Sequence, residues 1–303
     1  MSRIDEALRR KGQNGSQAAS PDAEGVFVSA WGADEPEVPG GSATESLLPS
    51  EPARPGEHVL IPEAPRTTER SPVTLSHAWR ERLAIAPEAN AVLVEQYRRL
   101  AATLHHAQSG SGIRVIMLTS ACADDGKTLT AVNLALVLSE SYRRRVLLID
   151  ADLRRPSLGN VADVTNAPGL SEALKSPTEQ KLGILQVTPT LMLLPAGRPN
   201  PDPMGGLTSA RMRHILEEAA GRFDWVILDA PPMGPMADAS LLSQMVDGAV
   251  FVVRAGRTQH PAVQRAIDAL GRERILGVVL NAVDHMPVEQ YEYAYPTAAE
   301  RQA

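Results

Sequence analysis

The stretch TSACADDGKT at 119–128 has the residue types and spacing of a phosphate-binding loop. It follows the apolar run RVIMLTS and precedes the helix-like run KTLTAVNLALVLSESY, so a strand enters the loop and a helix leaves it. Backbone N–H groups at a helix N-terminus attract phosphate, and the helix dipole adds to that attraction. Lys127 places a cation on the outer phosphates, and Thr128 offers a hydroxyl to Mg²⁺. We predict nucleotide contacts from Asp125, Gly126, Lys127, Thr128 and Leu129.

The loop departs from the pattern G-x-x-x-x-G-K-[ST] at its first position, which is Ala121. An alanine fits there if its φ is negative, because only glycine adopts a positive φ without strain. Asp124 and Asp125 also bring negative charge into a loop that binds anions. Their carboxylates must therefore point away from the phosphates or contact the metal.

Carboxylates also follow two further apolar runs. VLLIDAD at 146–152 ends in Asp150 and Asp152, and VILDAPP at 226–232 contains Asp229. Because the ends of parallel strands meet at one edge of a sheet, we expect these three acids near the GKT sequence. Mg²⁺ prefers a few carboxylates together with nucleotide oxygens. The combination predicts a nucleotide and magnesium site rather than three unrelated turn residues.

These motifs lie on alternating strands and helices. The strands are continuous apolar runs, which is typical of parallel strands that are covered on both faces. Strand–helix–strand repetition predicts a doubly wound α/β fold with a mostly parallel sheet of the P-loop NTPase type. Strands are predicted at 114–120, 145–152, 184–187, 191–196, 224–231, 248–255 and 275–283, and helices at 88–107, 127–142, 208–222, 236–246 and 260–272.

Composition divides the chain into four regions. Residues 1–11 are predicted to contain a short amphipathic helix, 12–85 to be a disordered linker, 86–283 to form the P-loop domain, and 284–303 to be a tail. Nine acidic residues and one arginine stand between residues 12 and 65, with repeated prolines. Such a composition buries too little apolar surface to offset the entropy of the chain.

The composition of the 303 residues also excludes several classes of protein. The net charge of −6 argues against a nucleic-acid binder that uses a general basic field. The single cysteine, Cys122, rules out an intramolecular disulfide framework and favours a cytoplasmic location. No apolar run approaches the ~20 residues that span a bilayer, so we expect no direct membrane span.

The acidic motifs resemble those of the bacterial tyrosine kinases (BY-kinases) of capsule and exopolysaccharide synthesis. LLIDADLR at 147–154 is similar to the family motif hhhDxDxR, and VILDAPP is similar to hhhDxPP. Further similarity lies in LPAGRP at 194–199, TSARMR at 208–213 and DAS at 238–240. The resemblance covers about residues 85–283.

This resemblance implies a role for each matching residue. ATP and Mg²⁺ are the implied cofactors, and Thr128, Asp152 and Asp229 are implied to bind the metal directly or through water. Asp150 is implied to accept the proton of the attacking tyrosine hydroxyl. Asn281 resembles a residue that contacts adenine in related P-loop proteins, although a capping or turn role is equally open. The implied catalytic residues are Lys127, Asp150 and Asp152.

Three of the five tyrosines, Tyr291, Tyr293 and Tyr295, stand within the stretch QYEYAYP. The family carries a C-terminal tyrosine cluster that a neighbouring subunit phosphorylates, so the resemblance implies a homo-oligomer and phosphorylation in trans. Packing of these rings on the domain is the alternative. Glu95 and Arg98 fit a family pattern for self-assembly, E-x-x-R-x-x-R, but the third position holds alanine.

The resemblance therefore implies an ATP-dependent tyrosine autokinase that regulates polysaccharide polymerisation or export. It also implies a membrane polysaccharide co-polymerase as activator, which recruits the kinase to the inner face of the cytoplasmic membrane. The first alternative is a ParA/MinD-like positioning ATPase, which needs a lysine at the loop position that Cys122 occupies. The second is a scaffold that binds nucleotide without transferring phosphate, which Ala121 and the acidic loop leave open.

Overall fold

The computed structural model describes residues 25–30, 61, 73, 75–86, 89–164, 167–176, 182–234 and 236–283. The predicted N-terminal helix within 1–11 and the tyrosines at 291, 293 and 295 lie outside the described residues. The fold is therefore argued from the described ranges, which include every motif of the predicted nucleotide site.

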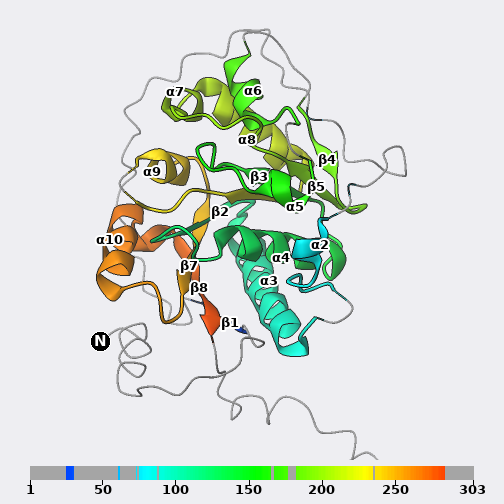
Figure 1. Cartoon of the computed structure of the whole chain (residues 1–303), viewed down its shortest axis with the longest axis vertical. Helices are drawn as coiled ribbons and strands as arrows, with labels where there is room; N and C mark the ends of the chain where they lie inside the picture. Colours follow the sequence, from blue (N-terminus) through cyan, green and yellow to red (C-terminus); the bar gives the residue numbers. More distant parts are fainter. Residues whose placement is uncertain are drawn as a thin grey trace, which may run out of the picture.

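One sheet forms the centre of the described part of the chain (Figure 1). Its eight strands are β1 (Gly25–Ala30), β2 (Val115–Ser120), β3 (Val146–Asp150), β4 (Leu185–Gln186), β5 (Leu191–Leu194), β6 (Trp225–Asp229), β7 (Gly248–Arg254) and β8 (Ile275–Val283). The order is β1-β8-β7-β2-β6-β3-β5-β4, and the strands from β8 to β5 pair in parallel. The edge strands β1 and β4 pair antiparallel with their neighbours.

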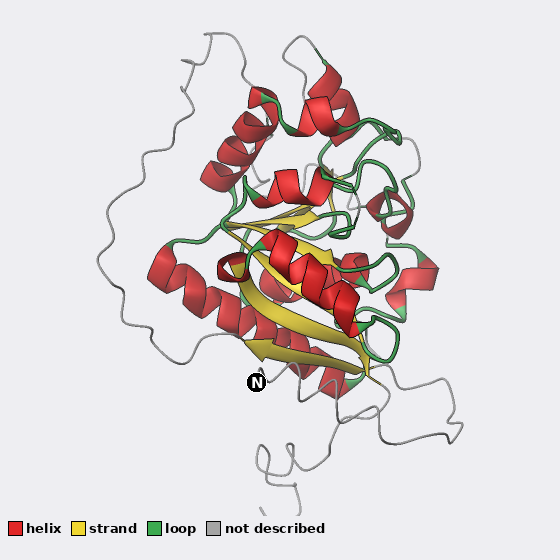
Figure 2. Cartoon of the chain, turned by 90° about the vertical axis from the view of Figure 1, so that its left-hand side faces the viewer, coloured by secondary structure: helices red, strands yellow, loops and turns green. Residues whose placement is uncertain are grey.

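Helices cover both faces of this sheet (Figure 2). They are α2 (His77–Arg80), α3 (Ala91–Ser111), α4 (Lys127–Glu140), α5 (Leu158–Val161), α6 (Leu170–Lys175), α7 (Met204–Leu207), α8 (Ala210–Arg222), α9 (Asp238–Ser243), α10 (His260–Leu270) and the 3₁₀ turn η1 (Arg272–Arg274). Successive strand residues point to opposite faces. Ile116 and Leu118 of β2 belong to the core that contains α3, α4 and α5, whereas Met117 belongs to the core that contains α6 to α10. The predicted doubly wound α/β fold is confirmed.

Most predicted elements are present with shifted ends. The helix predicted at 88–107 is α3, which begins where the Asn90 side chain accepts the N–H of Val92 at 2.8 Å and ends at Gly112, whose φ is 73°. The helices α5, α6 and α7 have four to six residues each, too few to show a helical period in the sequence. The helices of the described part include none that is long and apolar enough to cross a membrane.

The predicted disorder of residues 12–85 does not hold for the residues that the structure describes there. β1 pairs with β8 along one edge of the sheet. Further along, Val73 donates its N–H to the carbonyl of Gln186 at 2.8 Å, and Ser76 donates to Val161 at 2.9 Å. Composition averages over a segment, whereas a short piece of chain needs only an open strand edge to form backbone hydrogen bonds.

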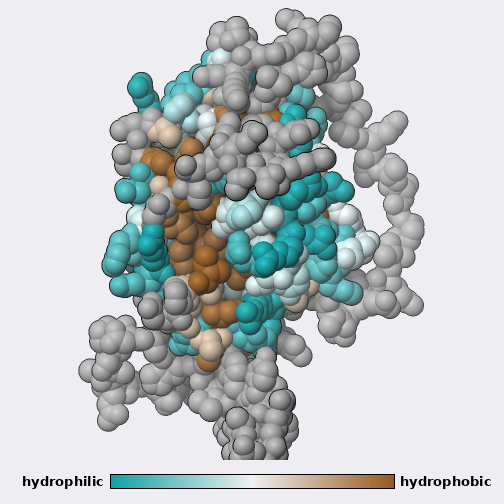
Figure 3. All heavy atoms as spheres, turned by 90° about the vertical axis from the view of Figure 1, so that its right-hand side faces the viewer, coloured by the Kyte–Doolittle hydropathy of each residue, from teal (hydrophilic) through white to brown (hydrophobic). Residues whose placement is uncertain are grey.

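Residues 75–86 dock on the face of the sheet that carries α4. Leu83 and Ala84 are buried, and Asn133 of α4 holds their backbone: its Oδ1 accepts the N–H of Ala84 at 2.6 Å, and its Nδ2 donates to the carbonyl of Arg82 at 3.2 Å. Apolar side chains gather in a band on the side of the molecule that Figure 3 views. An apolar groove between α4, α5 and β5 is lined by Leu75, Val132, Leu136, Leu148, Leu158, Val161, Val187, Leu191 and Leu193. The folded domain therefore includes chain before residue 86.

Candidate active site

The C-terminal ends of β2, β6 and β3 bring the predicted loop and acids together. Asp229, the last residue of β6, is the register partner of both Leu118 in β2 and Asp150 in β3. β2 continues through the loop into α4, which begins at Lys127. Burial raises the pKa of Asp152 and of Asp229, and the charge of Lys127 opposes both shifts. The ammonium group of Lys127 and these carboxylates therefore share one site.

Two residues with positive φ shape the loop, Asp124 at 61° and Gly126 at 95°. Ala121 is not among the residues with positive φ, so the alanine fits at the first loop position without that strain. Asn281, at the end of β8, donates from Nδ2 to the carbonyl of Asp125 at 2.9 Å. A Cβ added to Gly126 would lie 1.9 Å from the same Nδ2, so this position requires glycine for space as well as for conformation. Asn281 thus closes the loop from the side of β8.

The two acidic side chains of the loop lie in different environments. Asp125 is 1% exposed, and its carboxylate accepts the N–H of Cys122 at 2.9 Å and the hydroxyl of Thr258 at 2.7 Å. The carboxylate of Asp124 is exposed and lies 3.8 Å from the guanidinium of Arg257. The Asp125 carboxylate is therefore turned into the protein, which leaves the backbone of this residue for the predicted nucleotide contact.

Asp150 and Asp152 differ in their access to solvent. Asp150 is fully buried, and its Oδ2 accepts the N–H groups of Ser157 and Leu158, both at 2.9 Å. Burial, followed by the charge of Asp229, raises the pKa of Asp150 to about 8. Asp152 lies in the loop beyond β3, is partly exposed and lines the cavity described below. The predicted proton acceptor thus lies behind the cavity wall, and its neighbour faces the cavity.

The donors for a metal ion are oxygen atoms. The hydroxyl of Thr128 donates to Oδ2 of Asp229 at 2.6 Å and lies 2.9 Å from the hydroxyl of Ser157. Oδ1 of Asp229 is buried and has no hydrogen-bond partner among the described residues. In the described ranges no group of three or more His, Cys, Asp or Glu is arranged to hold a metal ion by itself. Thr128, Asp152 and Asp229 therefore fit Mg²⁺, which takes few protein oxygens and completes its shell with phosphate and water.

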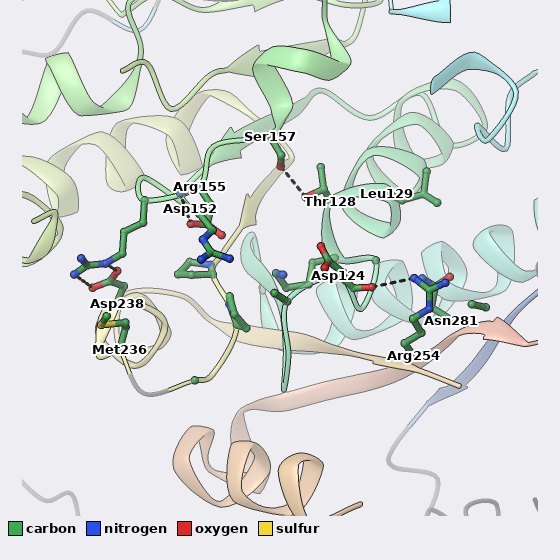
Figure 4. Close-up of a pocket in the computed structure, with 18 of the residues that line it drawn as sticks. Asp124, Thr128, Leu129, Asp152, Arg155, Ser157, Met236, Asp238, Arg254 and Asn281 are labelled. Carbon is green, nitrogen blue, oxygen red and sulfur yellow. Dashed lines mark hydrogen bonds and ion pairs between the residues drawn. The ribbon is translucent and has the colours of Figure 1, made fainter. Parts of the chain in front are cut away.

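A cavity of about 670 Å³ opens over these residues (Figure 4). Asp152 and Arg155 lie on one side of the loop, and Leu129 and Asn281 lie on the opposite side. The predicted residues that line the cavity are Gly126, Lys127, Thr128, Leu129, Asp152 and Asn281, and those that lie behind its wall are Asp125, Asp150 and Asp229. The cavity therefore has a charged end beside Asp152 and a second end on the side of Leu129.

Sequence reasoning missed several residues of this site. Ser157 and Arg254 line the cavity, and Thr258 holds the carboxylate of Asp125. Arg254 ends β7, so the rule that sites gather at the C-terminal ends of strands was the available signal for it, whereas Ser157 follows the end of β3 by seven residues and no pattern marked it. Trp79 and Arg82 also line the cavity, but they fell within the predicted linker and no pattern marked them.

Comparisons with known proteins identify the family of the chain. A family model described as "ParA: NUBPL iron-transfer P-loop NTPase" matches residues 113–294, more than half of the chain. Tyrosine-protein kinase YwqD of Bacillus subtilis (strain 168) is 34% identical over 203 residues, which cover 66% of this chain and 85% of YwqD. The chain belongs to the bacterial tyrosine kinases of the P-loop NTPase class. The motifs LLIDADLR and VILDAPP thus identified the family correctly.

Other bacterial tyrosine-kinase sequences and structures are similar over the same region. The solved kinase domain of the Escherichia coli tyrosine kinase ETK has a TM-score of 0.59 and 32% identity, and the match covers 68% of this chain and 80% of that domain. The succinoglycan biosynthesis transport protein ExoP of Rhizobium meliloti (strain 1021) is 33% identical over 203 residues, which cover 65% of this chain and 26% of ExoP. The chain thus spans most of YwqD and about a quarter of ExoP.

Proposed function

We propose that this bacterial tyrosine kinase transfers the γ-phosphoryl group of ATP to tyrosines near its own C-terminus, acting between two copies of the chain. The observation that carries the proposal is that Lys127, Thr128 and Asp152 line one cavity at the start of α4, with Asp229 directly behind Thr128 and bonded to its hydroxyl. Phosphoryl transfer depends on positioning and on electrostatic stabilisation, with little covalent chemistry for the protein to supply. Such a cluster of one cation, one hydroxyl and two carboxylates is suited to that task.

The phosphates of ATP bind where the backbone N–H groups of the loop meet the N-terminus of α4. Lys127 would direct its cation at the outer phosphates, and Thr128, Asp152 and Asp229 would hold Mg²⁺. When bound, Mg²⁺ supplies charge that neutralises the phosphate oxygens. Asn281 fixes the loop through the carbonyl of Asp125, and its contact with adenine stays a prediction.

The proton of the attacking tyrosine hydroxyl goes to the carboxylates that follow β3. A base is needed because a free tyrosine has a pKa of about 10. Asp150 has the raised pKa that suits a proton acceptor, but it lies behind the cavity wall. Asp152 faces the cavity, so we propose that Asp152 orients the hydroxyl, that the proton passes to Asp150 when Asp150 is ionised, and that Asp150 also holds the turn from Asp150 to Leu158 in place.

The tyrosines of the folded domain are poor acceptors, which supports the C-terminal cluster as the substrate. Tyr97 is fully buried, and burial raises its pKa to about 12. Tyr142 donates its hydroxyl to the carbonyl of Arg98 at 3.3 Å and follows the C-terminal end of α4, about 20 Å along the helix from the loop. Neither side chain can enter the cavity of its own domain without a large rearrangement. The tyrosines at 291, 293 and 295 are the remaining candidates.

We further propose that the phosphorylation regulates exopolysaccharide or capsule polymerisation or export. The support is the match of this chain to a region of ExoP, whose name refers to succinoglycan biosynthesis and transport. We also propose that the kinase is cytoplasmic and that a membrane polysaccharide co-polymerase recruits and activates it. Transfer in trans further requires that the chain forms a homo-oligomer. A positioning ATPase is the second candidate function, and Cys122 at the loop position that needs a lysine counts against it.

Incubation of the full chain with labelled ATP and Mg²⁺, followed by mass-spectrometric mapping of phosphotyrosine, tests the proposal. We expect label on Tyr291, Tyr293 or Tyr295 in the wild type and in Tyr142→Phe, and none in Lys127→Met. A triple variant with phenylalanine at the three C-terminal positions should transfer label to the Lys127→Met chain when the two are mixed, which shows transfer in trans. Release of free phosphate without phosphotyrosine indicates a positioning ATPase, and the absence of both indicates a scaffold.

A further inference from the structure

We propose that Trp79 is a nucleoside-binding residue and that residues 75–86 form one wall of the nucleotide site. The inference rests on the proposed nucleotide site and adds a recognition element to it. The ring of Trp79 packs on the nucleoside, while the loop holds the phosphates. This assigns a ligand contact to a part of the chain that its composition marks as a linker.

The two sides of the cavity differ in the chemistry of their side chains. The end beside Asp152 also contains Arg155, Arg154 and Asp238, a set of charged groups that suits phosphate and the incoming hydroxyl. Leu129 and Asn281 lie on the opposite side of the loop (Figure 4). A triphosphate that starts at the charged end and crosses the loop directs its nucleoside toward Leu129.

Trp79 lines this cavity, and we place its ring at the second end. It lines the same cavity as Leu129, as does Arg82, which follows α2 in the chain. Figure 1 places α2 beside α4, the helix on which Leu129 follows Thr128. The ring of Trp79 is partly buried against the apolar core, so it is held in place yet keeps a surface toward the cavity.

The segment that carries Trp79 is fixed to the helix that binds the phosphates. Asn133 lies on α4, and its amide bonds to both Ala84 and Arg82, at 2.6 and 3.2 Å. Asn133 is fully buried, and it stands six residues after Lys127, about 9 Å along the helix axis. Residues 75–86 and the phosphate-binding loop are therefore both attached to α4. This shared attachment sets the position of Trp79 relative to the phosphates.

The chemistry of an indole suits this position. Ligand sites are lined mainly by apolar and aromatic side chains with a few polar groups that fix orientation. An aromatic side chain stacks on a nucleobase with about 1–3 kcal/mol per base, and a guanidinium adds attraction to the ring face or to phosphate. The family model that matches this chain begins at residue 113, so this wall lies outside the shared P-loop core.

Binding of ADP and of tripolyphosphate, each with Mg²⁺, to the full chain tests the inference. Calorimetry on Trp79→Ala should show ADP binding that is roughly 5- to 150-fold weaker than in the wild type. Tripolyphosphate has no nucleoside, so its affinity should stay within about twofold of the wild type, which also shows that the loop is intact. Trp79→Phe keeps an aromatic ring and should recover most of the ADP affinity.

Ile85→Ala is the matched control, because Ile85 is a large apolar residue of the same segment that is 42% exposed and does not line the cavity. Its ADP affinity should equal that of the wild type. The tryptophan emission of Trp31→Phe, which keeps Trp79, should change when ADP binds. The emission of Trp79→Phe should not change when ADP binds. Unaltered ADP affinity in Trp79→Ala overturns this inference alone, whereas a wild type that binds neither ADP nor tripolyphosphate overturns the proposed function.

Discussion

The hydroxyl of Thr128 lies 2.6 Å from Oδ2 of Asp229, and this hydrogen bond joins the first turn of α4 to the end of β6. The other oxygen of Asp229 is buried and unpaired within the described part of the chain. A buried carboxylate with one unpaired oxygen is costly as an anion, because burial removes its water without full replacement. Burial therefore raises the pKa of Asp229 to about 6 in the metal-free site, and a divalent cation at the unpaired oxygen would offset the cost of the charge.

Stability of the metal-free protein should fall as the pH rises from about 4 to 8. Burial raises the pKa of Asp229 to about 6, and burial with the charge of Asp229 raises that of Asp150 to about 8. Above about pH 4 the unfolded chain releases these protons while the folded chain keeps them. The stabilisation is complete below that pH and is lost as the pH rises through the raised values. Thermal unfolding in EDTA measures this as a falling midpoint.

Asp229→Asn should reduce this fall, because the substituted site has one ionisable group fewer. Asp268→Asn is the matched control, since Asp268 is an exposed carboxylate of α10, and its pH profile should follow the wild type. Mg²⁺ with ADP should also flatten the profile of the wild type. A wild-type midpoint that rises over this pH range in EDTA contradicts the account.

Arg154→Ala should lower the unfolding midpoint by more than about 5 °C. The guanidinium of Arg154 donates to both carboxylate oxygens of Asp238, at 2.5 and 3.2 Å, and also to the carbonyl of Pro201. Asp238 is buried at the start of α9, so removal of the arginine leaves a buried carboxylate without its cation. Differential scanning calorimetry on the variant measures the effect.

Arg155→Ala is the neighbouring control, because only the backbone N–H of Arg155 makes a described hydrogen bond, to Asp152. Its midpoint should change by less than about 2 °C. The double variant Arg154→Ala with Asp238→Ala should be more stable than Arg154→Ala alone, because it no longer buries an unpaired charge. Equal unfolding midpoints for the single and double variants would show that the ion pair of Arg154 and Asp238 does not hold the turn after β3 to α9.

The convergence of Asp150 and Asp229 was predictable because it follows from topology. Both acids end apolar runs, and parallel strands place such ends at one edge of the sheet. The register pairing of Asp150 with Asp229 agrees with that rule. Which acid faces the cavity was not predictable, because the turn from Asp150 to Leu158 decides it. In that turn the backbone N–H groups of Ser157 and Leu158 bind Asp150 and leave Asp152 toward the cavity.

The elements before residue 86 were not predictable, because their partners stand far away in the sequence. β1 needs the edge of β8, some 250 residues later in the chain. The segment that carries Trp79 needs the buried amide of Asn133. Local composition contains no information about either partner, so a proline-rich and acidic stretch indicated a linker throughout.

Gly126→Ala should weaken the binding of both ADP and tripolyphosphate. Gly126 has a φ of 95°, and an added Cβ meets the amide of Asn281 at 1.9 Å. An alanine in left-handed backbone costs about 1–2 kcal/mol, and the collision must be relieved by opening the loop or moving Asn281. Either change displaces the N–H groups that bind phosphate, so calorimetry should show at least tenfold weaker binding of both ligands.

Gly110→Ala is the control for the same exchange, since Gly110 lies in α3 with nothing within 4 Å of the added Cβ. This variant should bind both ligands normally and gain about 0.5–1 kcal/mol of stability from better helix propensity. Gly126→Ala combined with Asn281→Ala removes the collision but keeps the backbone strain, so binding should recover only in part. Full recovery would assign the whole defect to the collision, and normal binding by Gly126→Ala alone would show that phosphate does not bind at this loop.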